Sequence, residues 1–309
     1  MVGHPDLRED IMKTTLRRSL PVILILFFCL LAAPALSGAQ GQRHFLWRAT
    51  TDTATVYLLG SVHFMKKEAY PLSPVIEAAF TRSDTIAVEA DINDIGEGTF
   101  AKLRSTGFYG TDDSIANHVS RETYTYITAE AARLGFPVAA LNRQRPWFLA
   151  MTMSSIELMR AGYNPHYGID KYFLTRAAGR KKIVELESLD YQIDLLAGLP
   201  DTEQESFLLY ALKDLGSLVR QADILMTAWR TGDSARIAAI LERSVGNDKD
   251  RQAVYRKIMT ERNRNMAKKI ALHLASPGTV FVVVGAGHLV GDTGIVELLR
   301  KEGFTVEQL

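Results

Sequence analysis

The chain has 309 residues and a formal net charge of +1, from 36 lysine and arginine residues against 35 aspartate and glutamate residues. This near-neutral balance, without a basic face, argues against a nucleic-acid-binding protein. The one cysteine, Cys29, lies in the N-terminal segment, so the remainder of the chain has neither a disulfide nor a thiol nucleophile.

The first 39 residues have the order of a secretory signal peptide. Basic residues between positions 13 and 18 precede an apolar run at 20–33, and small residues follow that run. The run is shorter than the roughly 20 residues that cross a bilayer. We therefore expect cleavage after Ala35 or Ala39, which leaves residues 40–309 as one domain without a membrane span, periplasmic or secreted. An uncleaved N-terminal anchor is the alternative.

The first part of the expected domain alternates between strands and a helix. Residues 44–49 and 55–59 are rich in β-forming side chains and are separated by a short polar turn, which predicts a hairpin. A helix is expected at 74–82, and a short buried strand at 85–89.

The middle of the chain is expected to be mostly helical. From 92 to 180 we predict helices interrupted by a small strand at 138–141 and by a turn-rich stretch at 163–168. Another strand is expected at 182–186. Further helices are predicted after a capping box at Thr202 and Glu205, at 234–243, and at 251–275.

The C-terminal part returns to strands, with an apolar strand at 279–284, a helix at 295–301 and a last strand at 304–308. Strands at both ends and helices between them predict an α/β fold. We expect a mixed central sheet built from the N- and C-terminal thirds, with a large helical insertion at roughly 92–275 that includes short strands.

Two Gly-x-x-His turns are the main candidates for a functional site in the sequence. Gly60 to His63 and Gly285 to His288 each follow an apolar strand directly. Glycine allows a positive φ or a close backbone approach at such a turn. One such turn alone is a weak signal, because a lone histidine is more often a satisfied polar group than a ligand. The matched pair at strand ends favours a shared site.

Carboxylates follow two other strands. Glu89 ends the strand at 85–89, and Glu187 follows the strand at 182–186. Two histidines with at least one carboxylate are a donor set for a divalent metal ion. The alternative for Glu89 is a helix cap; if Glu89 is a ligand, Asp91 is the expected cap.

Other residues allow two interpretations each. Glu187 is either a residue that supports a ligand or a cap for the next helix. Asp170 either orients a histidine or caps a helix that begins near Ile169. Arg262 lies in a helix rich in basic residues, and composition alone predicts that it is an ordinary solvated arginine. No phosphate-binding glycine loop, His-Glu-x-x-His motif or serine elbow is present.

Six motifs in order resemble the TraB/GumN family, which includes the Tiki-type metalloproteases and is related to erythromycin esterase-like and ChaN-like proteins. The motifs are Leu59-Gly60-Ser61-Val62-His63, Val88-Glu89-Ala90-Asp91, Gly168-Ile169-Asp170, Leu186-Glu187-Ser188, Arg262-Asn263, and the segment 284–291, which contains Gly285, Gly287 and His288. The resemblance runs from about His44 to the C-terminus. Ser61 stands where threonine is commoner in the family.

The resemblance implies a metal-dependent hydrolase. His63, His288 and Glu89 would hold a divalent cation, manganese or cobalt in the Tiki branch, with zinc or iron as further options. Glu89 would be either the third ligand or the general base. Arg262 would stabilise an oxyanion, and Asn263 would orient the substrate or support a ligand.

Three functions remain open from the sequence. The first is an exported, peptidase-like hydrolase that acts on a peptide or small-molecule substrate. The second, allowed by the ChaN resemblance, is a non-catalytic protein that binds haem or a metal ion. The third is an accessory role in polysaccharide export or conjugation, which only the family's names suggest.

Overall fold

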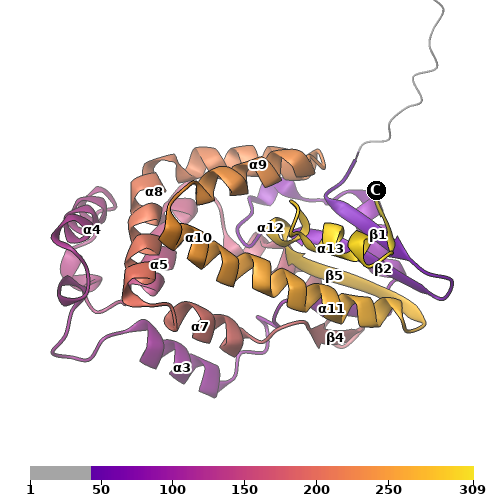
Figure 1. The fold of residues 1–309 in the computed structure, drawn as a ribbon, viewed down its shortest axis with the longest axis horizontal. Helices are drawn as coiled ribbons and strands as arrows, with labels where there is room; N and C mark the ends of the chain where they lie inside the picture. The colour runs from indigo at the N-terminus through magenta and orange to yellow at the C-terminus, as the bar shows by residue number, and fades with distance from the viewer. Residues whose placement is uncertain (1–42) are drawn as a thin grey trace, which may run out of the picture. The chain divides into compact units, whose positions relative to one another are not determined.

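A six-stranded mixed sheet lies at the centre of the computed structural model, which describes residues 43–309 (Figure 1). The expected signal peptide, and Cys29 within it, lie outside the described residues. In spatial order the strands are β4 (Lys182–Glu185), β3 (Thr85–Val88), β5 (Gly278–Gly285), β2 (Ala54–Ser61), β1 (Leu46–Thr50) and β6 (Thr305–Gln308). The predicted α/β fold, with a sheet shared by the two ends of the chain, is confirmed.

The sheet divides into a parallel and an antiparallel part. β4, β3, β5 and β2 are parallel to one another, whereas β1 pairs antiparallel with both β2 and β6. β5 is a run of valine and phenylalanine, and its central residues are buried. Such a continuous apolar run is typical of a parallel strand that is covered on both faces. The parallel part therefore has four carboxyl ends at one edge.

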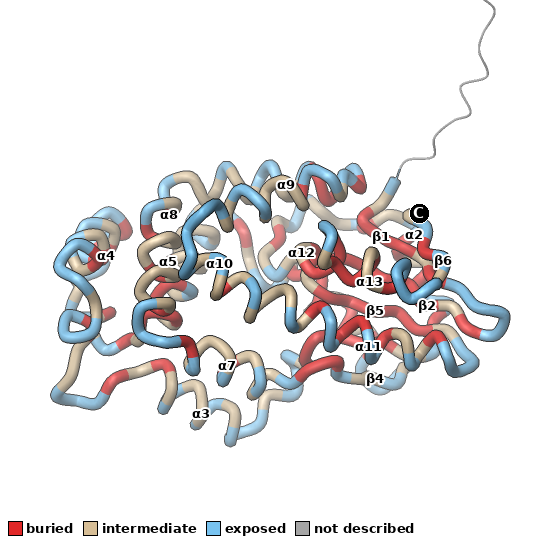
Figure 2. The backbone as a smooth tube through the Cα atoms, in the orientation of Figure 1, coloured by how far each residue is buried: buried red, intermediate tan, exposed pale blue. Residues whose placement is uncertain are grey.

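Helices from several parts of the chain pack around this sheet (Figure 1). They are α2 (Pro74–Arg82), α6 (Ile169–Ala177), α11 (Arg262–Leu274), α12 (Ala286–Leu289) and α13 (Ile295–Lys301). α2 begins at Ser73, whose side chain accepts a hydrogen bond from Val75, with proline in the first turn. The buried side chains of the sheet and these helices form the larger core (Figure 2).

The insertion is helical, as predicted, and has a smaller core of its own between α4, α5 and α8 (Figure 2). Its helices are α3 (Glu97–Gly107), α4 (Arg121–Arg133), α5 (Pro146–Arg160), α7 (Leu189–Ala197), α8 (Asp201–Arg230), α9 (Ser234–Val245) and α10 (Lys249–Tyr255). Short 3-10 turns lie among them at η2 (Ile115–Asn117), η3 (Val138–Ala140) and η4 (Pro165–Tyr167), and a further one, η1 (Lys67–Ala69), lies between β2 and α2. No helix within residues 43–309 is long and apolar enough to cross a bilayer.

Two local predictions were wrong. Residues 138–140 form the 3-10 turn η3 and not a strand, because Ala140 N and Leu141 N donate to carbonyls three residues earlier, and two of the three residues are exposed. The capping box at Thr202 is also absent, since α8 begins one residue earlier, after Pro200. The Glu205 carboxylate instead accepts hydrogen bonds from Ser120 N and Thr123 Oγ1, which ties α8 to α4.

The expected helix at 251–275 is interrupted. Between α10 and α11 the backbone forms a π-helical segment, η5 (Arg256–Glu261). Such segments are rare and frequently occur at functional sites. η5 ends directly before Arg262, so it sets the angle at which this side chain leaves the helix.

Candidate active site

The two Gly-x-x-His turns leave the sheet side by side. β2 and β5 are parallel neighbours in which Gly60 pairs with Val284 and Ser61 pairs with Gly285. The two turns are therefore offset by one residue at the same edge. The ends of β3 and β4 lie at this edge too, because Glu187 N donates to Glu89 O at 2.8 Å, beyond the last strand residues. The parallel topology thus brings the motifs that follow these four strands together at one edge of the sheet.

Gly60 is needed for a close backbone approach. A Cβ atom at this position would lie 2.3 Å from a ring carbon of Phe45 and 3.1 Å from the Cα of Ala286. The Gly60 carbonyl accepts a hydrogen bond of 2.6 Å from Trp229 Nε1. Space, and not a positive φ, is therefore what requires glycine at the first turn.

The second turn is built against Glu89. Gly285 N donates to Glu89 Oε1 at 2.6 Å, and a Cβ atom on Gly285 would come within 3.2 Å of the same oxygen. Gly287 lies within α12, where a Cβ atom would meet the end of Met259 at 3.1 Å. Both glycines thus let the turn pack closely, one against Glu89 and one against η5.

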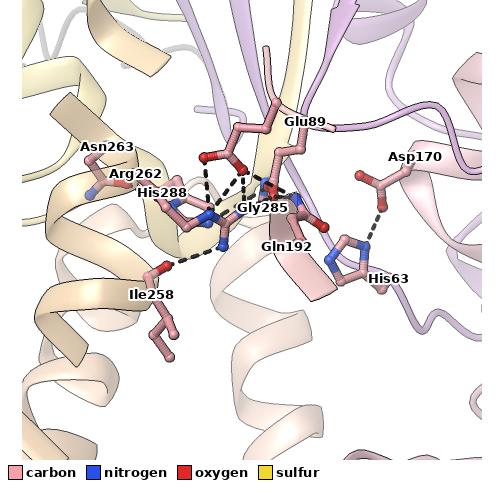
Figure 3. Close-up of polar contacts among 10 residues, drawn as sticks. His63, Glu89, Asp170, Gln192, Ile258, Arg262, Asn263, Gly285 and His288 are labelled. Carbon is pink, nitrogen blue, oxygen red and sulfur yellow. Dashed lines mark hydrogen bonds and ion pairs between the residues drawn. The ribbon is translucent and has the colours of Figure 1, made fainter. Parts of the chain in front are cut away.

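Glu89 lies at the centre of the site (Figure 3). Its Oε2 accepts hydrogen bonds from Arg262 Nη2 at 2.5 Å and from Gln192 Nε2 at 3.1 Å. Burial works to raise the pKa of Glu89, but the positive charges of Arg262 and His63 and the Gly285 N–H hold it below its usual value. Glu89 is therefore ionised at neutral pH, as a metal ligand or proton acceptor must be.

Arg262 joins two buried carboxylates. Its Nη2 donates to Glu187 Oε2 at 2.7 Å as well as to Glu89, and its Nε donates to the same Glu187 oxygen at 2.9 Å. Its Nη1 donates to the carbonyl of Ile258 in η5 at 3.1 Å (Figure 3). The side chain is 11% exposed, so it is not the solvated arginine that composition alone suggested. In this arrangement its single positive charge is shared between Glu89 and Glu187.

Glu187 does not cap the next helix. The cap of α7 is Ser188, whose side chain accepts a hydrogen bond from Tyr191 N. The side chain of Glu187 is 4% exposed and faces Arg262. Asp91 is not a helix cap either, because its Oδ1 accepts from Asn93 N within a local turn and α3 begins only at Glu97.

His288 is buried, and its ring forms a hydrogen bond with the side-chain amide of Asn263. Its Nδ1 lies 2.5 Å from Asn263 Oδ1, and Asn263 Nδ2 donates to Thr293 O at 2.8 Å. The amide oxygen can only accept, so Nδ1 carries the proton and Nε2 keeps its lone pair. Burial lowers the pKa of His288, which favours this neutral form. Nε2 lies 3.8 Å from Glu89 Oε1.

His63 is paired with Asp170. Its Nδ1 lies 2.8 Å from Asp170 Oδ2, although 65% of the imidazole is exposed. The charge of Asp170 raises the pKa of His63 to about 9. Asp170 does not cap α6, whose N-cap is Gly168. The pair is held by backbone contacts, since Ile169 N donates to Val62 O and a Cβ on Gly168 would lie 2.5 Å from His63 O.

The described side chains do not already form a metal cage. Within residues 43–309, no three histidine, cysteine, aspartate or glutamate side chains converge closely enough to hold a metal ion. Glu89 is turned toward Arg262 and Gly285, and His63 toward Asp170 (Figure 3). The donor chemistry nevertheless suits a divalent cation. Each imidazole has Nδ1 held by an oxygen, which leaves Nε2 to face an ion, the arrangement usual behind metal-binding histidines. His63, whose pKa is raised, would release its Nε2 proton when an ion binds.

Gln192 was not singled out from the sequence. It lies on α7, and its Nε2 donates to Glu89 Oε2 at 3.1 Å and to Glu187 Oε2 at 3.2 Å. A glutamine within a helix carries no local signal for this role. Its only indication in the sequence is its position five residues after Glu187, which puts it on the first turns of the helix that follows β4.

The His63–Asp170 pair gives the ion-free protein a predicted pH dependence. The pKa of His63 is raised from an unfolded value of about 6.5, so its contribution to stability is complete below about pH 6.5 and is lost as the pH rises through about 9. The difference in unfolding free energy between the wild type and His63→Ala, measured in EDTA, should therefore shrink between about pH 6 and pH 10. A difference that stays constant over this range would contradict the pairing.

Comparisons with known proteins confirm the resemblance seen in the sequence. The TraB/PrgY/gumN family matches residues 45–308, which is nearly all of the described chain. No solved structure matches this chain.

Among the curated relatives, uncharacterized protein YbaP of Escherichia coli (strain K12) is 26% identical and covers 85% of this chain and 96% of its own. A metalloprotease TIKI homolog of Amphimedon queenslandica is 21% identical, over 96% of this chain and 69% of its own. An uncharacterized protein of Treponema pallidum (strain Nichols) is also 21% identical, over 91% of this chain and 89% of its own.

Proposed function

Because this chain belongs to the TraB/PrgY/gumN family, we propose that it is a metal-dependent hydrolase of the peptidase type that acts after export from the cytoplasm. The observation that carries the proposal is the pair of histidines at neighbouring strand ends, each with Nδ1 held by an oxygen, with Glu89 3.8 Å from Nε2 of His288. The relative named as a metalloprotease matches nearly the whole chain, which supports the peptidase class. The signal-like N-terminal sequence supports export.

His63 and His288 would hold the ion through Nε2, and Glu89 would contribute a carboxylate oxygen. Manganese or cobalt is the first choice, and zinc or iron also suits imidazole and carboxylate donors. Such an ion, when bound, supplies Lewis acidity that polarises a scissile carbonyl and activates water. Asn263 keeps Nδ1 of His288 protonated, and Asp170 does the same for His63, so both residues orient the donors.

The protein's own groups suggest how the proton and the charges are handled. Glu89 is ionised and buried, so it can accept a proton from an attacking water if it is not itself a ligand. Arg262 uses its donors on Glu89, Glu187 and Ile258. We therefore assign Arg262 first to positioning Glu89. The second N–H of Nη1 is the donor that these contacts do not use, and a role at the oxyanion would fall to it.

A peptide library tests this function. The purified protein should cleave peptides, lose this activity when the metal is chelated with EDTA, and regain it when manganese is added. Activity that survives complete chelation would contradict a metal-dependent reaction. An intrinsic Soret band on the purified protein, without peptide cleavage, would instead support the haem-binding alternative.

Asp170→Asn is expected to lower the affinity for manganese by about 10–100-fold, the usual effect of losing a partner behind a metal-binding histidine. The amide can still accept from Nδ1 but no longer supplies the negative charge that makes the imidazole a stronger donor. The matched control is Asp113→Asn, because Asp113 Oδ2 also pairs with a histidine, 2.7 Å from His118 Nε2. Calorimetric titration with manganese measures both, and equal affinities in the two variants would rule out this role for Asp170.

A further inference from the structure

A second concave site lies on the insertion, beside α3. Its cavity volume is about 870 Å³, within the range of small-molecule and peptide-side-chain pockets. We call it the arginine groove and define it by six of its lining residues: Phe100, Leu103, Arg104, Phe108, Tyr109 and Arg143. α3 provides one wall, and the segment that ends in Arg143 provides the other.

The groove contains two arginines that form no ion pair within residues 43–309. None of the residues that line it is acidic. Arg104 and Arg143 are not among the arginines that form ion pairs within residues 43–309. Arg143 Nη2 donates only to a backbone carbonyl, that of Tyr109, at 3.1 Å. Asp201 and Asp113 are the acidic groups near Tyr109; neither lines the groove, and Asp113 is already bonded to His118 and Asn117.

The floor of the groove is aromatic and partly open to solvent. Phe100 is 52% exposed, an unusual state for a phenylalanine on a helix. Phe108 packs on Phe148, and Tyr109 stacks on His118 with ring centroids 4.2 Å apart, so these rings are fixed in place. Exposed apolar surface next to unpaired arginines is typical of a binding surface.

We propose that the arginine groove binds an extended peptide in which an acidic side chain lies next to a bulky apolar one. The carboxylate would pair with Arg104 and Arg143, and the apolar side chain would cover Phe100. An extended peptide fits better than a lipid chain, because Phe100 and Arg104 both leave the groove open to solvent. Binding here does not require the metal chemistry at the strand ends.

The position of the groove would also allow it to select substrates for the candidate active site. α3 begins eight residues after Glu89 and spans 11 residues, or roughly 16 Å of helix. It packs along α7, which carries Gln192 (Figure 1). A peptide held in the groove would therefore lie on the helix that follows Glu89 in the chain and that packs beside the helix of Gln192. This part of the inference rests on the proposed function, whereas the binding itself does not.

The test is fluorescence anisotropy in EDTA with a short, C-terminally amidated peptide that contains Glu-Phe-Leu. Matched peptides carry glutamine for glutamate or serine for phenylalanine. The wild type should bind the first peptide at least ~10-fold more tightly than either other one, about 1.4 kcal/mol. The double variant Arg104→Glu/Arg143→Glu should lose this binding. Arg180→Glu, at an exposed arginine outside the groove, reverses one charge, which is half the change in the double variant, and should retain binding.

The proposal is overturned if the wild type does not bind the peptide, if the glutamine peptide binds equally well, or if the double variant behaves like Arg180→Glu. Binding of decanoate without binding of the peptide would also overturn it, in favour of a lipid ligand. The two proposals fail separately. Unaltered peptide binding in a protein that cleaves nothing argues against the hydrolase alone, and cleavage without groove binding argues against the groove alone.

Discussion

Arg262→Ala is expected to lower the free energy of unfolding by about 3–5 kcal/mol, the usual cost of removing one partner from a buried ion pair. Arg262 is the cation shared by Glu89 and Glu187, whose side chains are only 10% and 4% exposed. Without it, two carboxylates remain buried near each other, and their remaining hydrogen-bond donors within residues 43–309 are Gln192 and the Gly285 N–H. Chemical denaturation in EDTA measures the loss without any contribution from bound metal.

The pH dependence of this variant separates lost charge pairing from lost packing. Without Arg262, the folded-state pKa of a buried carboxylate rises above its unfolded value of about 4.3. A group with a raised pKa stabilises the fold below its unfolded pKa and loses that contribution as the pH rises. The loss of unfolding free energy caused by Arg262→Ala should therefore be larger at about pH 8 than at about pH 5.

Arg133 provides the matched control. It also bonds two glutamates, Glu130 and Glu157, but 41% of its side chain is exposed. Surface pairs of this kind contribute about 0–1 kcal/mol, so Arg133→Ala should change stability little. If Arg262→Ala costs no more than Arg133→Ala, the pairing of Arg262 with Glu89 and Glu187 is not what holds the site together.

The sequence predicts most of the sheet because its signals are local. Apolar strands that end in glycine identify β2 and β5, and proline after Ser73 marks the start of α2. The parallel pairing of β2 with β5 then follows from the need to bury both strands. The order of the strands, with β1 and β6 added antiparallel at one edge, depends on tertiary contacts and not on any local pattern.

The site is predicted less completely, for a similar reason. Strand-end histidines and glutamates can be recognised one at a time, but the pairing of Arg262 joins residues 173 and 75 positions away. Composition alone favours a solvated arginine there, and only the family motif singled it out. Gln192 and the π-helical segment before Arg262 have no sequence signature. The roles of both can be recognised only when α7 and α11 are placed against the ends of β3 and β4.

His63→Ala and His288→Ala are each expected to lower metal affinity by about 1,000-fold or more, roughly 4 kcal/mol. Losing a supporting partner behind a ligand costs 10–100-fold, so losing a ligand should cost more. The two substitutions should have the same effect, although His63 is largely exposed and His288 is buried. Metal analysis of the purified proteins, with circular dichroism to confirm folding, measures the result.

His118→Ala is the control for this pair of variants, because His118 also bonds an aspartate and packs on an aromatic ring, but on the insertion. It should retain the wild-type metal content. If His63→Ala and His288→Ala both fold and also retain it, the ion does not lie between the two turns, and their placement at neighbouring strand ends serves packing alone. If only His288→Ala loses the ion, His63 is not a ligand, and its pairing with Asp170 makes it a candidate for proton transfer instead.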